Sequence, residues 1–458
     1  MKIKFPINKH EITVLSLFSG CGGLDIPFSS EPYRILSAYD SDPAAILCLK
    51  HNLDCRAVVM DVSLPEFQSE LKKFENVDII LGGFPCQGFS KSGPKKHDDP
   101  RNKLYLAMLN AIKTLRPTIF IAENVDGMIQ NFKGSFVDRI HSDFSDAGYT
   151  VDHRILNAVN YGVPQFRRRI FFVGKRNDIA TDFSWPQPIH SGTSRNGEFK
   201  TRWDIDDTPN LFDRINLQEP LTIADAIGDL LTDSTSIPDH VYDIATSTKD
   251  TLIMEKIEEG QKLCNVRFSN SSVYTWDIPE VFGKTSTRER QILMTIGKNR
   301  RKKVYGSIPN GNPLSLELIS NLSGLQISVS EIQVLINKGY LKDIHGKYDL
   351  KGAMFCSGLY KRPCWSEPAP TILTVFNNPR FLFHPKIARP LTVRECARLQ
   401  SFPDSFEFLA SGITMEDAYR LIGNAVPPRL AQCLERGIYD FFSILRGTNE
   451  IEAKTAFA

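Results

Sequence analysis

This sequence lacks the features that mark several specialised classes of protein. Its nine cysteines include no Cys-x-x-Cys pair and have no histidine at zinc-site spacing, so the common zinc sites are excluded. No apolar run is long enough to cross a bilayer, and the short run Val14–Phe18 leads into glycines rather than into a signal-peptide cleavage pattern. An odd number of scattered cysteines fits a reducing compartment. We therefore expect a cytoplasmic protein without a metal site.

A strong excess of charge of either sign is also missing. The 55 lysines and arginines nearly balance the 53 aspartates and glutamates, which leaves a net charge of +2. Such a total does not indicate nucleic-acid binding, so any such surface has to come from local clusters. Internal repeats and low-complexity tracts are absent as well, and a length of 458 residues favours two domains.

Short β-branched runs alternate with helical patterns from residue 12 to about 174. This alternation is typical of an α/β fold with a doubly wound, mostly parallel sheet. A helix with apolar residues at helical spacing is expected from Asn102 to Ile112, ended by Arg116-Pro117. The predicted strands are Ile12–Phe18, Arg34–Asp40, Arg56–Val59, Val77–Leu81, Thr118–Glu123, Asp152–Val159 and Arg169–Gly174.

The alternation is lost after Gly174, and segments rich in Trp, Pro, Asn, Ser and Asp follow. This change predicts a second, loop-rich domain. We expect the first domain to comprise residues 1–178 and 410–458, with a helix near the C-terminus returning to it. The second domain would then span residues 179–409.

A glycine-rich turn, Gly82–Ser90, follows one predicted strand and contains Cys86. An α/β enzyme presents catalytic side chains at the carboxyl edge of its sheet, and glycines permit close approach of a substrate. Cys86 is therefore a candidate nucleophile. A buried structural cysteine is the alternative, because lone cysteines are among the most buried residues.

A second glycine-rich loop follows the first predicted strand and fits a turn beneath a nucleotide-like cofactor. Asp40 ends the next strand, twenty residues beyond Gly20, where a carboxylate can accept hydrogen bonds from ribose hydroxyls. Asp61 adds a carboxylate at the same edge, although an aspartate before Pro65 also fits a helix cap. By themselves the loop and Asp40 would equally suit an oxidoreductase that uses a nicotinamide cofactor.

Charged residues at two later strands are expected at the edge that carries Cys86. Glu123 ends the apolar run Ile119–Ala122, where burial would raise its pKa and let it donate a proton. Alternation along the next strand puts Arg167 and Arg169 on one face. Each arginine alone would also fit ordinary surface charge. Their expected position at the same sheet edge as Cys86 and Glu123 favours a functional site instead.

These motifs and two near the C-terminal end form an ordered set: Phe18-Ser19-Gly20-x-Gly22-Gly23, Pro85-Cys86-Gln87, Glu123-Asn124-Val125, Gln165-x-Arg167-x-Arg169, Arg394-Glu395-x-x-Arg398-Leu399-Gln400 and Gly423-Asn424-x-Val426. In this order they resemble the main sequence blocks of the DNA (cytosine-5)-methyltransferases. The resemblance covers residues 12–175 and about 365–435. Asp40 departs from the family pattern, where glutamate is usual, and Phe84 replaces a common proline.

The resemblance implies a Rossmann-like methyltransferase domain that uses S-adenosylmethionine (SAM), and a target-recognition domain between the blocks. It also implies that Cys86 adds covalently to C6 of cytosine, with Glu123 at N3, Arg167 near O2 and Arg169 in the same catalytic group. The implied cofactor-binding residues are Phe18, Ser19, Gly20, Gly22, Gly23, Leu24, Asp40, Asp61, Pro85, Asn424 and Val426.

Double-stranded DNA is the implied substrate, and its target cytosine has to be flipped out of the helix to reach Cys86. A basic cluster at residues 298–303 fits phosphate contacts, although a solvated helix end is the usual explanation for an isolated charge run. We assign DNA contacts to Ser90, Lys91, Gln165, Lys298, Arg300, Arg301, Lys302 and Lys303.

Two other functions remain open for a chain with these motifs. One is an RNA (tRNA) cytosine-5-methyltransferase, which the long insertion between Arg169 and Arg389 disfavours because it suggests a dedicated duplex reader. The other is a catalytically silent DNA-binding regulator, which intact Cys86, Glu123 and Arg167 disfavour. Family analogy implies a role in a bacterial restriction–modification system, in which a cognate restriction endonuclease would act on the same site. We also expect a monomer, because the sequence shows no appended regulatory segment.

Overall fold

The computed structural model describes most of the chain, in ten stretches. Four residues of the expected site, Pro85, Cys86, Ser90 and Lys91, lie outside them. The described stretches are 11–84, 104–130, 135–192, 217–231, 237–241, 246–265, 269–308, 311–351, 357–375 and 378–447.

The chain divides into two compact units, both of them discontinuous in sequence. The first consists of Met1–Val241, Ser366–Thr374 and Val393–Ala458, and the second of Tyr242–Trp365 and Val375–Thr392. The expected boundaries at 178 and 410 therefore lie elsewhere. Residues 179–241 and 393–409 belong to the first unit because their contacts are made there, as where Arg394 pairs with Asp239.

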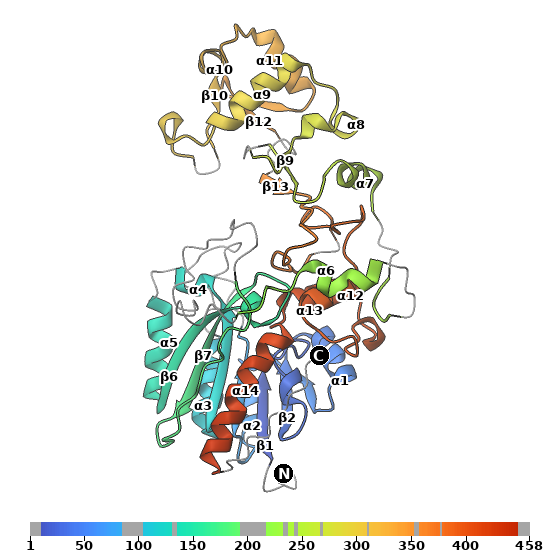
Figure 1. The fold of residues 1–458 in the computed structure, drawn as a ribbon. Coiled ribbons are helices and arrows are strands. Elements are labelled where there is room, and N and C mark those ends of the chain that lie inside the picture. Colours follow the sequence, from blue (N-terminus) through green and yellow to red (C-terminus); the bar gives the residue numbers. More distant parts are fainter. Residues whose placement is uncertain are drawn as a thin grey trace. The chain divides into compact units, whose positions relative to one another are not determined.

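A seven-stranded sheet forms the centre of the first unit (Figure 1). Its strand order is β3-β2-β1-β4-β5-β7-β6, with β7 antiparallel to both neighbours and the other pairs parallel. The predicted mostly parallel sheet is confirmed. The strands are β1 (Ile12–Leu17), β2 (Tyr33–Asp40), β3 (Ala57–Val59), β4 (Ile79–Gly82), β5 (Ile119–Val125), β6 (Tyr149–Asn157) and β7 (Arg168–Arg176).

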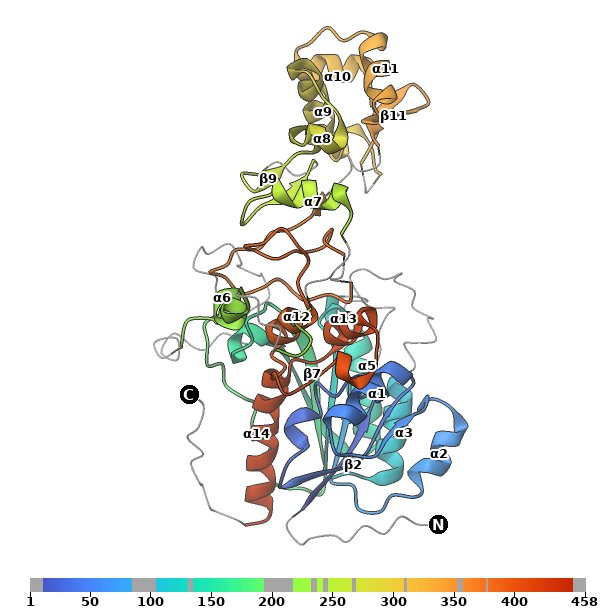
Figure 2. The same cartoon turned by 90° about the vertical axis from the view of Figure 1, so that its right-hand side faces the viewer.

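Both faces of this sheet are buried, as expected where apolar residues occupy successive strand positions. Val14, Ile79 and Ile121 contribute to one buried cluster, whereas their neighbours Leu15 and Ile80 contribute to another on the opposite face. Helices cover both clusters, with α14 on one side of the sheet and α2 and α3 on the other (Figure 2). The helices of this unit are α1 (Pro43–Asn52), α2 (Pro65–Leu71), α3 (Tyr105–Leu115), α4 (Gly127–Gln130), α5 (Ser135–Asp146), α6 (Ile223–Ile227), α12 (Val393–Leu399), α13 (Met415–Asn424) and α14 (Pro428–Leu445).

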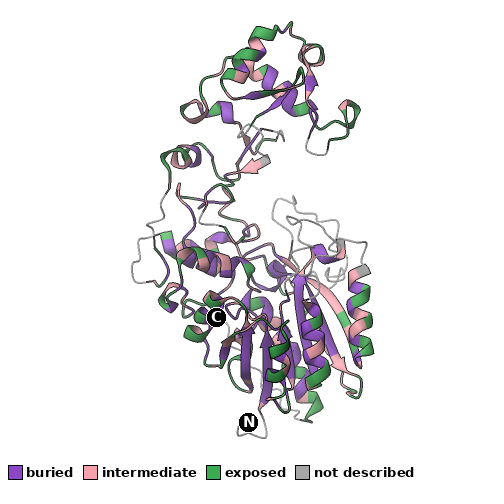
Figure 3. Cartoon of the chain, turned by 180° about the vertical axis from the view of Figure 1, so that it is seen from behind, coloured by how far each residue is buried: buried purple, intermediate pink, exposed green. Residues whose placement is uncertain are grey.

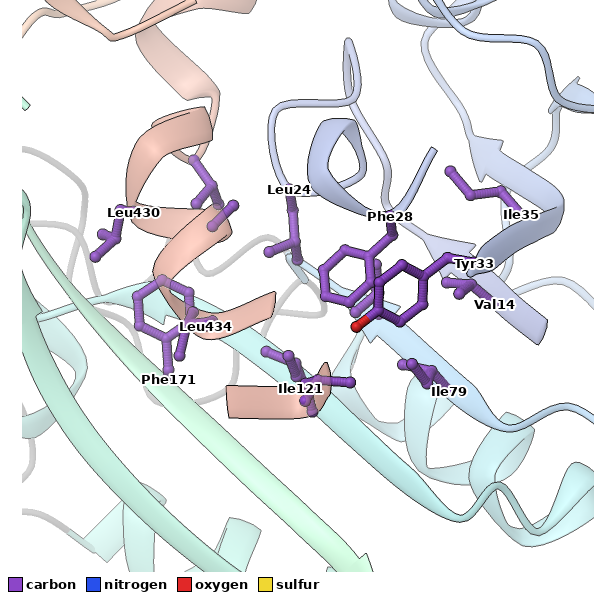
Figure 4. Close-up of a cluster of buried hydrophobic side chains, with 14 of the residues drawn as sticks. Val14, Leu24, Phe28, Tyr33, Ile35, Ile79, Ile121, Phe171, Leu430 and Leu434 are labelled. Atoms are coloured by element: carbon purple, nitrogen blue, oxygen red, sulfur yellow. The ribbon is translucent and has the colours of Figure 1, made fainter. Parts of the chain in front are cut away.

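The C-terminal helix α14 packs against the N-terminal part of the first unit, as the sequence predicts. Its Leu430 and Leu434 lie in the cluster that includes Leu24, Phe28 and Phe171 (Figure 4). Helix α3 is also confirmed: it ends at Leu115, because Arg116 takes a left-handed conformation (φ 53°) before Pro117. The return of α14 makes the first unit discontinuous and closes one face of its sheet.

The second unit is more regular than expected. It has a hydrophobic cluster of its own, in which Trp276, Ile292, Leu293 and Ile332 are buried. Its elements are α7 (Thr248–Glu255), β8 (Lys262–Cys264), β9 (Ser272–Val273), α8 (Pro279–Phe282), α9 (Thr287–Asn299), β10 (Leu314–Ser315), α10 (Leu316–Ser323), α11 (Val329–Asn337), β11 (Leu341–Ile344), β12 (Lys347–Leu350) and β13 (Ser357–Leu359). The expectation of a loop-rich domain is therefore wrong for residues 286–351.

Candidate active site

A cavity of about 380 Å³ lies within the first unit, at the carboxyl ends of β1, β2, β4 and β5. Ligands bind at this edge in open α/β sheets because loops and helix starts converge there. The C-terminal segment that begins at Arg420 completes the wall. The expected site residues that line the cavity are Phe18, Ser19, Gly20, Gly23, Leu24, Asp40, Glu123, Arg169, Asn424 and Val426.

The glycine loop after β1 forms one wall by a sharp turn. Phe18 and Gly20 have φ values of 54° and 55°, and Gly22, which does not line the cavity, has a φ of 94°. Gly23 is required for another reason, since a Cβ there would lie 2.4 Å from the carbonyl oxygen of Val426. That glycine lets the first loop and the C-terminal segment meet, and so brings two distant motifs to one cavity.

Asp40 holds the glycine loop from the end of β2. One carboxylate oxygen accepts a hydrogen bond from the Gly20 amide (2.8 Å) and the other from the Asp42 amide (2.9 Å). Burial raises the pKa of Asp40, although these amide hydrogen bonds oppose the shift. The short Asp40 side chain thus holds the backbone at Gly20 and Asp42 in place within the cavity wall.

Asp42 and Arg420 form an ion pair at the cavity that sequence reasoning missed. Asp42 also caps helix α1 by accepting a hydrogen bond from the Ala44 amide. Its position before Pro43 does signal a helix start, but Arg420 comes from a helix 378 residues further on. Only the fold reveals that they meet.

Asp61 lies apart from this cavity in the part of the chain that the structure describes. It is exposed, and its Oδ1 accepts hydrogen bonds from the amide and the hydroxyl of Ser63 at 2.9 Å and 2.6 Å. Asp61 therefore forms a local turn with Ser63. Helix α2 begins after Leu64 without a side-chain cap, so the structure supports neither the helix cap nor a place for Asp61 in this cavity.

Glu123 and Arg169 form an ion pair in the cavity wall. Arg169 Nε lies 2.9 Å from Glu123 Oε1, and the two side chains are only 13% and 11% exposed. Burial raises the pKa of Glu123, while the charges of Arg169 and Arg167 and the hydrogen bond from Arg169 oppose that shift. The pair thus consists of a guanidinium and a carboxyl group, and the carboxyl group retains its proton more readily than usual.

The end of β4 lies directly beside this pair. A Cβ at Gly83 would be 3.4 Å from Glu123 Oε2, so the backbone there passes close to the carboxyl group. Buried Asn124 donates a hydrogen bond from Nδ2 to the carbonyl oxygen of Phe84 (2.9 Å). Asn124 therefore positions the chain two residues before Cys86.

Arg167 has a different place from the one expected. Its side chain is 1% exposed and donates to the main-chain carbonyls of Ile372 (3.1 Å), Gly423 (2.7 Å) and Ala425 (3.0 Å). Both terminal nitrogens therefore bind the backbone. The structure thus corrects the assignment of Arg167 near O2 of the base, since Arg169 is the arginine at the cavity.

Gln165 is likewise buried rather than exposed to DNA. Its amide group accepts a hydrogen bond from the Ile372 amide (2.9 Å) and donates to Gln400 Oε1 (2.6 Å) and the Leu399 carbonyl (3.0 Å). Gln400 in turn donates to the Ala425 carbonyl (2.7 Å). These contacts correct the DNA assignment of Gln165 and give it a structural role.

The basic cluster at residues 298–303 of the second unit contains both buried and exposed residues. Arg300 is 1% exposed and forms a bidentate pair with Asp349, at 2.6 Å and 2.8 Å, so it is corrected from a phosphate contact to a structural residue. The other four residues of the cluster are exposed. They are Lys298, Arg301, Lys302 and Lys303.

Two features are absent from the described residues. No group of three or more His, Cys, Asp or Glu side chains in the described stretches is placed to hold a metal ion. Within the same stretches, no helix combines the length and apolar character needed to cross a membrane.

Comparison with known proteins agrees with this site. The model of the family "C-5 cytosine-specific DNA methylase" matches residues 12–440. The Type II methyltransferase M.NgoFVII of Neisseria gonorrhoeae is 28% identical, with 94% of this chain and 87% of that protein covered. M.FnuDI of Fusobacterium nucleatum, also named a Type II methyltransferase, is 28% identical over 97% of this chain and 99% of its own.

A solved structure supports the fold independently. It is a prophage-encoded protein described as a DNA modification methyltransferase (E. coli), with a TM-score of 0.52 and 23% identity. The match covers 94% of this chain and 100% of that one. With the family model matched over most of its length, the chain belongs to the family of C-5 cytosine-specific DNA methylases and is a DNA methyltransferase.

Proposed function

We propose that this enzyme transfers a methyl group from SAM to C5 of a cytosine that is flipped out of duplex DNA. The observation that carries the proposal is the buried Glu123–Arg169 pair, which shares a cavity with the glycine loop. The pair offers a proton and a positive charge beside the cofactor wall. A nicotinamide oxidoreductase would give this pair no role.

The cavity suits SAM in size and in chemistry. Its volume of about 380 Å³ lies within the usual range of small-molecule sites. Carboxylates at Asp40 and Asp42 fit a ligand with hydroxyl and ammonium groups. When bound, SAM would supply a methyl group activated by a positively charged sulfur. The residues that we propose to hold it are Phe18, Ser19, Gly20, Gly23, Leu24, Asp40, Asn424 and Val426.

Cytosine needs activation because its C5 is a poor nucleophile. We propose that the thiolate of Cys86 adds to C6, forming an S–C6 bond and moving electron density toward N3 and O2. Glu123 would donate its proton to N3, and Arg169 would stabilise the charge at O2. The ring then has enamine character, so C5 can accept the methyl group.

Two bonds then have to break for the ring to be restored. C5 loses its proton to a base, which water can relay, and the electron pair of that C–H bond re-forms the C5–C6 double bond. The S–C6 bond breaks with its electron pair returning to Cys86 as thiolate. N3 loses its proton again, which restores Glu123 and leaves 5-methylcytosine.

Flipping a base out of the stack costs on the order of a few kcal/mol, which contacts to DNA have to offset. We propose that the exposed Lys298, Arg301, Lys302 and Lys303 contact phosphates and supply a salt-dependent part of the affinity. The second unit would thus serve as the target-recognition domain. Ser90 and Lys91 remain proposed DNA contacts on sequence grounds.

The names of the relatives suggest the biological setting. Because M.NgoFVII and M.FnuDI are named Type II methyltransferases, we propose that this enzyme protects one short DNA motif inside a bacterial cell. A cognate restriction endonuclease would act on the same motif. We propose that the methyltransferase acts as a monomer.

A transfer assay with purified protein and SAM labelled in its methyl group tests this proposal. Duplex DNA and tRNA are offered separately, and the labelled nucleoside is identified after digestion. Label in 5-methylcytosine from DNA alone is the expected result. Label from tRNA alone would replace the DNA proposal with the RNA function, and binding of DNA without any transfer would indicate a silent regulator.

A further inference from the structure

Residues 286–351 of the second unit fold into one recognisable arrangement, here named the winged module. Its order is α9, β10, α10, α11, β11 and β12, and its sheet has the order β10-β12-β11 with both pairs antiparallel (Figure 1). Two consecutive helices thus stand between a first helix and a β-hairpin. This is the topology of a helix-turn-helix with a hairpin wing.

The turn between α10 and α11 is well defined. Gly324 ends α10 in a left-handed conformation (φ 68°), and Ser328 begins α11 with a capping box closed by Glu331. Ile327 in the turn and Ile332 in α11 are buried in the cluster that also holds α9. A short turn with a glycine and a shared core are the features expected of a helix-turn-helix.

Contacts from α9 hold α11 at both ends. Arg288 donates to Glu331 Oε1 at the start of α11, with a distance of 2.5 Å. Lys338, just after the end of α11, lies 2.6 Å from Glu289 of α9. The helix is therefore fixed on its support, and its outward face has a defined direction relative to the module.

The outward face of α11 carries groups that match the edges of base pairs. Ser330, Gln333, Val334 and Asn337 are exposed at helical spacing, opposite the buried Ile332. Gln333 donates a hydrogen bond to Asn337 Oδ1 (2.9 Å), which orients both amides. Val334 is 45% exposed. None of these four residues is charged, whereas the exposed face of a solvated helix usually carries charged side chains in salt bridges.

The winged module also concentrates positive charge. Residues 286–351 contain eleven lysines and arginines against five aspartates and glutamates, a formal charge of +6, whereas the whole chain has only +2. Lys342 and Lys347 in the wing strands and His345 at its tip are exposed. Outer faces of this unit's helices are exposed while their inner faces are buried (Figure 3). Such a local excess favours a polyanion as the partner.

We propose that α11 is the helix that enters the major groove of the substrate DNA and reads its sequence, with the wing alongside it on the backbone. The inference rests on the proposed function, because it names the specificity element of that reaction. Gln333 or Asn337 would bind the N6 and N7 edge of adenine, and Val334 would contact a thymine methyl group. The recognition motif thus contains an A·T pair read by this helix.

Selection of binding sites by the full-length protein tests this inference without requiring methyl transfer. The wild type, Gln333→Ala and Asn337→Ala are each mixed with short duplexes of random sequence, and the bound duplexes are sequenced. Gln291→Ala is the matched control, since it removes an exposed glutamine from α9 of the same module. Circular dichroism establishes that each variant is folded.

The wild type and Gln291→Ala are expected to enrich one motif with an A·T pair. At least one α11 variant should lose discrimination at that pair by about tenfold or more, which is the usual contribution of a bidentate base contact. Unchanged motifs and discrimination in both α11 variants would overturn the inference. A wild type that enriches no motif would also overturn it and favour a protein partner for this face. Failure of methyl transfer leaves this selection unaffected, so the two proposals fail separately.

Discussion

Neighbouring charged residues on one strand have separate tasks in this enzyme. Alternation predicts Arg167 and Arg169 on one face of the sheet, but β7 begins at Arg168, so Arg167 directly precedes the strand. It cannot show that Arg167 ends among the backbone carbonyls of Ile372, Gly423 and Ala425, because those segments lie more than 200 residues away. Arg169 alone pairs with Glu123. Long-range packing thus decides which of the two arginines reaches the cavity.

Glu123 is expected to act as an acid, and Glu123→Gln tests this. The amide can still donate a hydrogen bond to N3 but cannot transfer a proton, so turnover should fall about 10²- to 10⁴-fold. Burial raises the pKa of Glu123, and wild-type activity should therefore decline as pH rises through that raised pKa and the carboxyl group loses its proton. Steady-state rates across pH measure both effects. If activity declines with rising pH in the same way in the variant, the decline belongs to another group.

Asp25 is expected to make stability depend on pH. It is fully buried, and burial raises its pKa to about 7. The unfolded chain releases this proton near pH 4, so between about pH 4 and 7 the folded state binds more protons and stability declines as pH rises. Above pH 7 the cost stays constant, at about 4 kcal/mol for a shift of about three pKa units.

Asp25→Asn removes the ionisable group and should abolish this decline. Thermal unfolding at several pH values should show the stability of the variant increasing relative to the wild type as pH rises to about 7. The control Asp54→Asn, at an exposed position, should change the pH dependence of stability little. Parallel curves for the wild type and Asp25→Asn would refute the assignment.

At the scale of elements, the C-terminal segment completes the cavity of the first unit. Buried side chains hold it in place: Arg167 binds the carbonyls of Gly423 and Ala425, and Gln400 binds Ala425 as well. Gly23 allows the close approach from the other side. The cavity wall therefore depends in part on Arg167 and Gln400, which do not line the cavity themselves.

Arg167→Lys and Arg169→Lys should therefore differ in what they impair. The first should lower stability and SAM binding, and the second should lower methyl transfer. A lysine at 167 cannot reproduce a planar fork among three carbonyls, so the free energy of unfolding should drop by about 2 kcal/mol or more and SAM binding should weaken. Lysine at 169 should leave stability nearly unchanged and lower methyl transfer. Denaturant unfolding, SAM titration and turnover numbers separate the two. The reverse pattern would return the catalytic role to Arg167.

The elements of the first unit could be predicted from sequence better than those of the second. Buried strands such as β5 begin with continuous apolar runs, here Ile119–Ala122, which the sequence shows directly. Helices α9 and α11 were missed, although Ser286 with Glu289 and Ser328 with Glu331 are capping-box signals that precede apolar residues.

At the scale of the whole molecule, positive charge is distributed unevenly. The winged module has a formal charge of +6, so the rest of the chain is net negative. The total of +2 conceals this division. Sequence alone could not separate the exposed Lys302 and Lys303 from Arg300, because the partner of Arg300, Asp349, lies 49 residues further on.

Lys302→Gln combined with Lys303→Gln should reduce the salt dependence of DNA binding. Each phosphate contact contributes about −0.9 to the slope of log affinity against log salt, so the slope should become less steep by up to about 2. Anisotropy titrations with labelled duplex at several salt concentrations measure it. Exposed Lys113→Gln on α3 serves as the control. An unchanged slope would show that these lysines make no phosphate contacts.

The central claim is cytosine methylation through Cys86, and bisulfite sequencing tests it most directly. Plasmid DNA is taken from cells that lack cytosine methylation of their own and express either the wild type or Cys86→Ala, with soluble protein verified in both. We predict cytosines protected from conversion within one short motif in the wild type, and complete conversion in the variant. Complete conversion with both proteins, or the same protected motif with Cys86→Ala, would contradict the account.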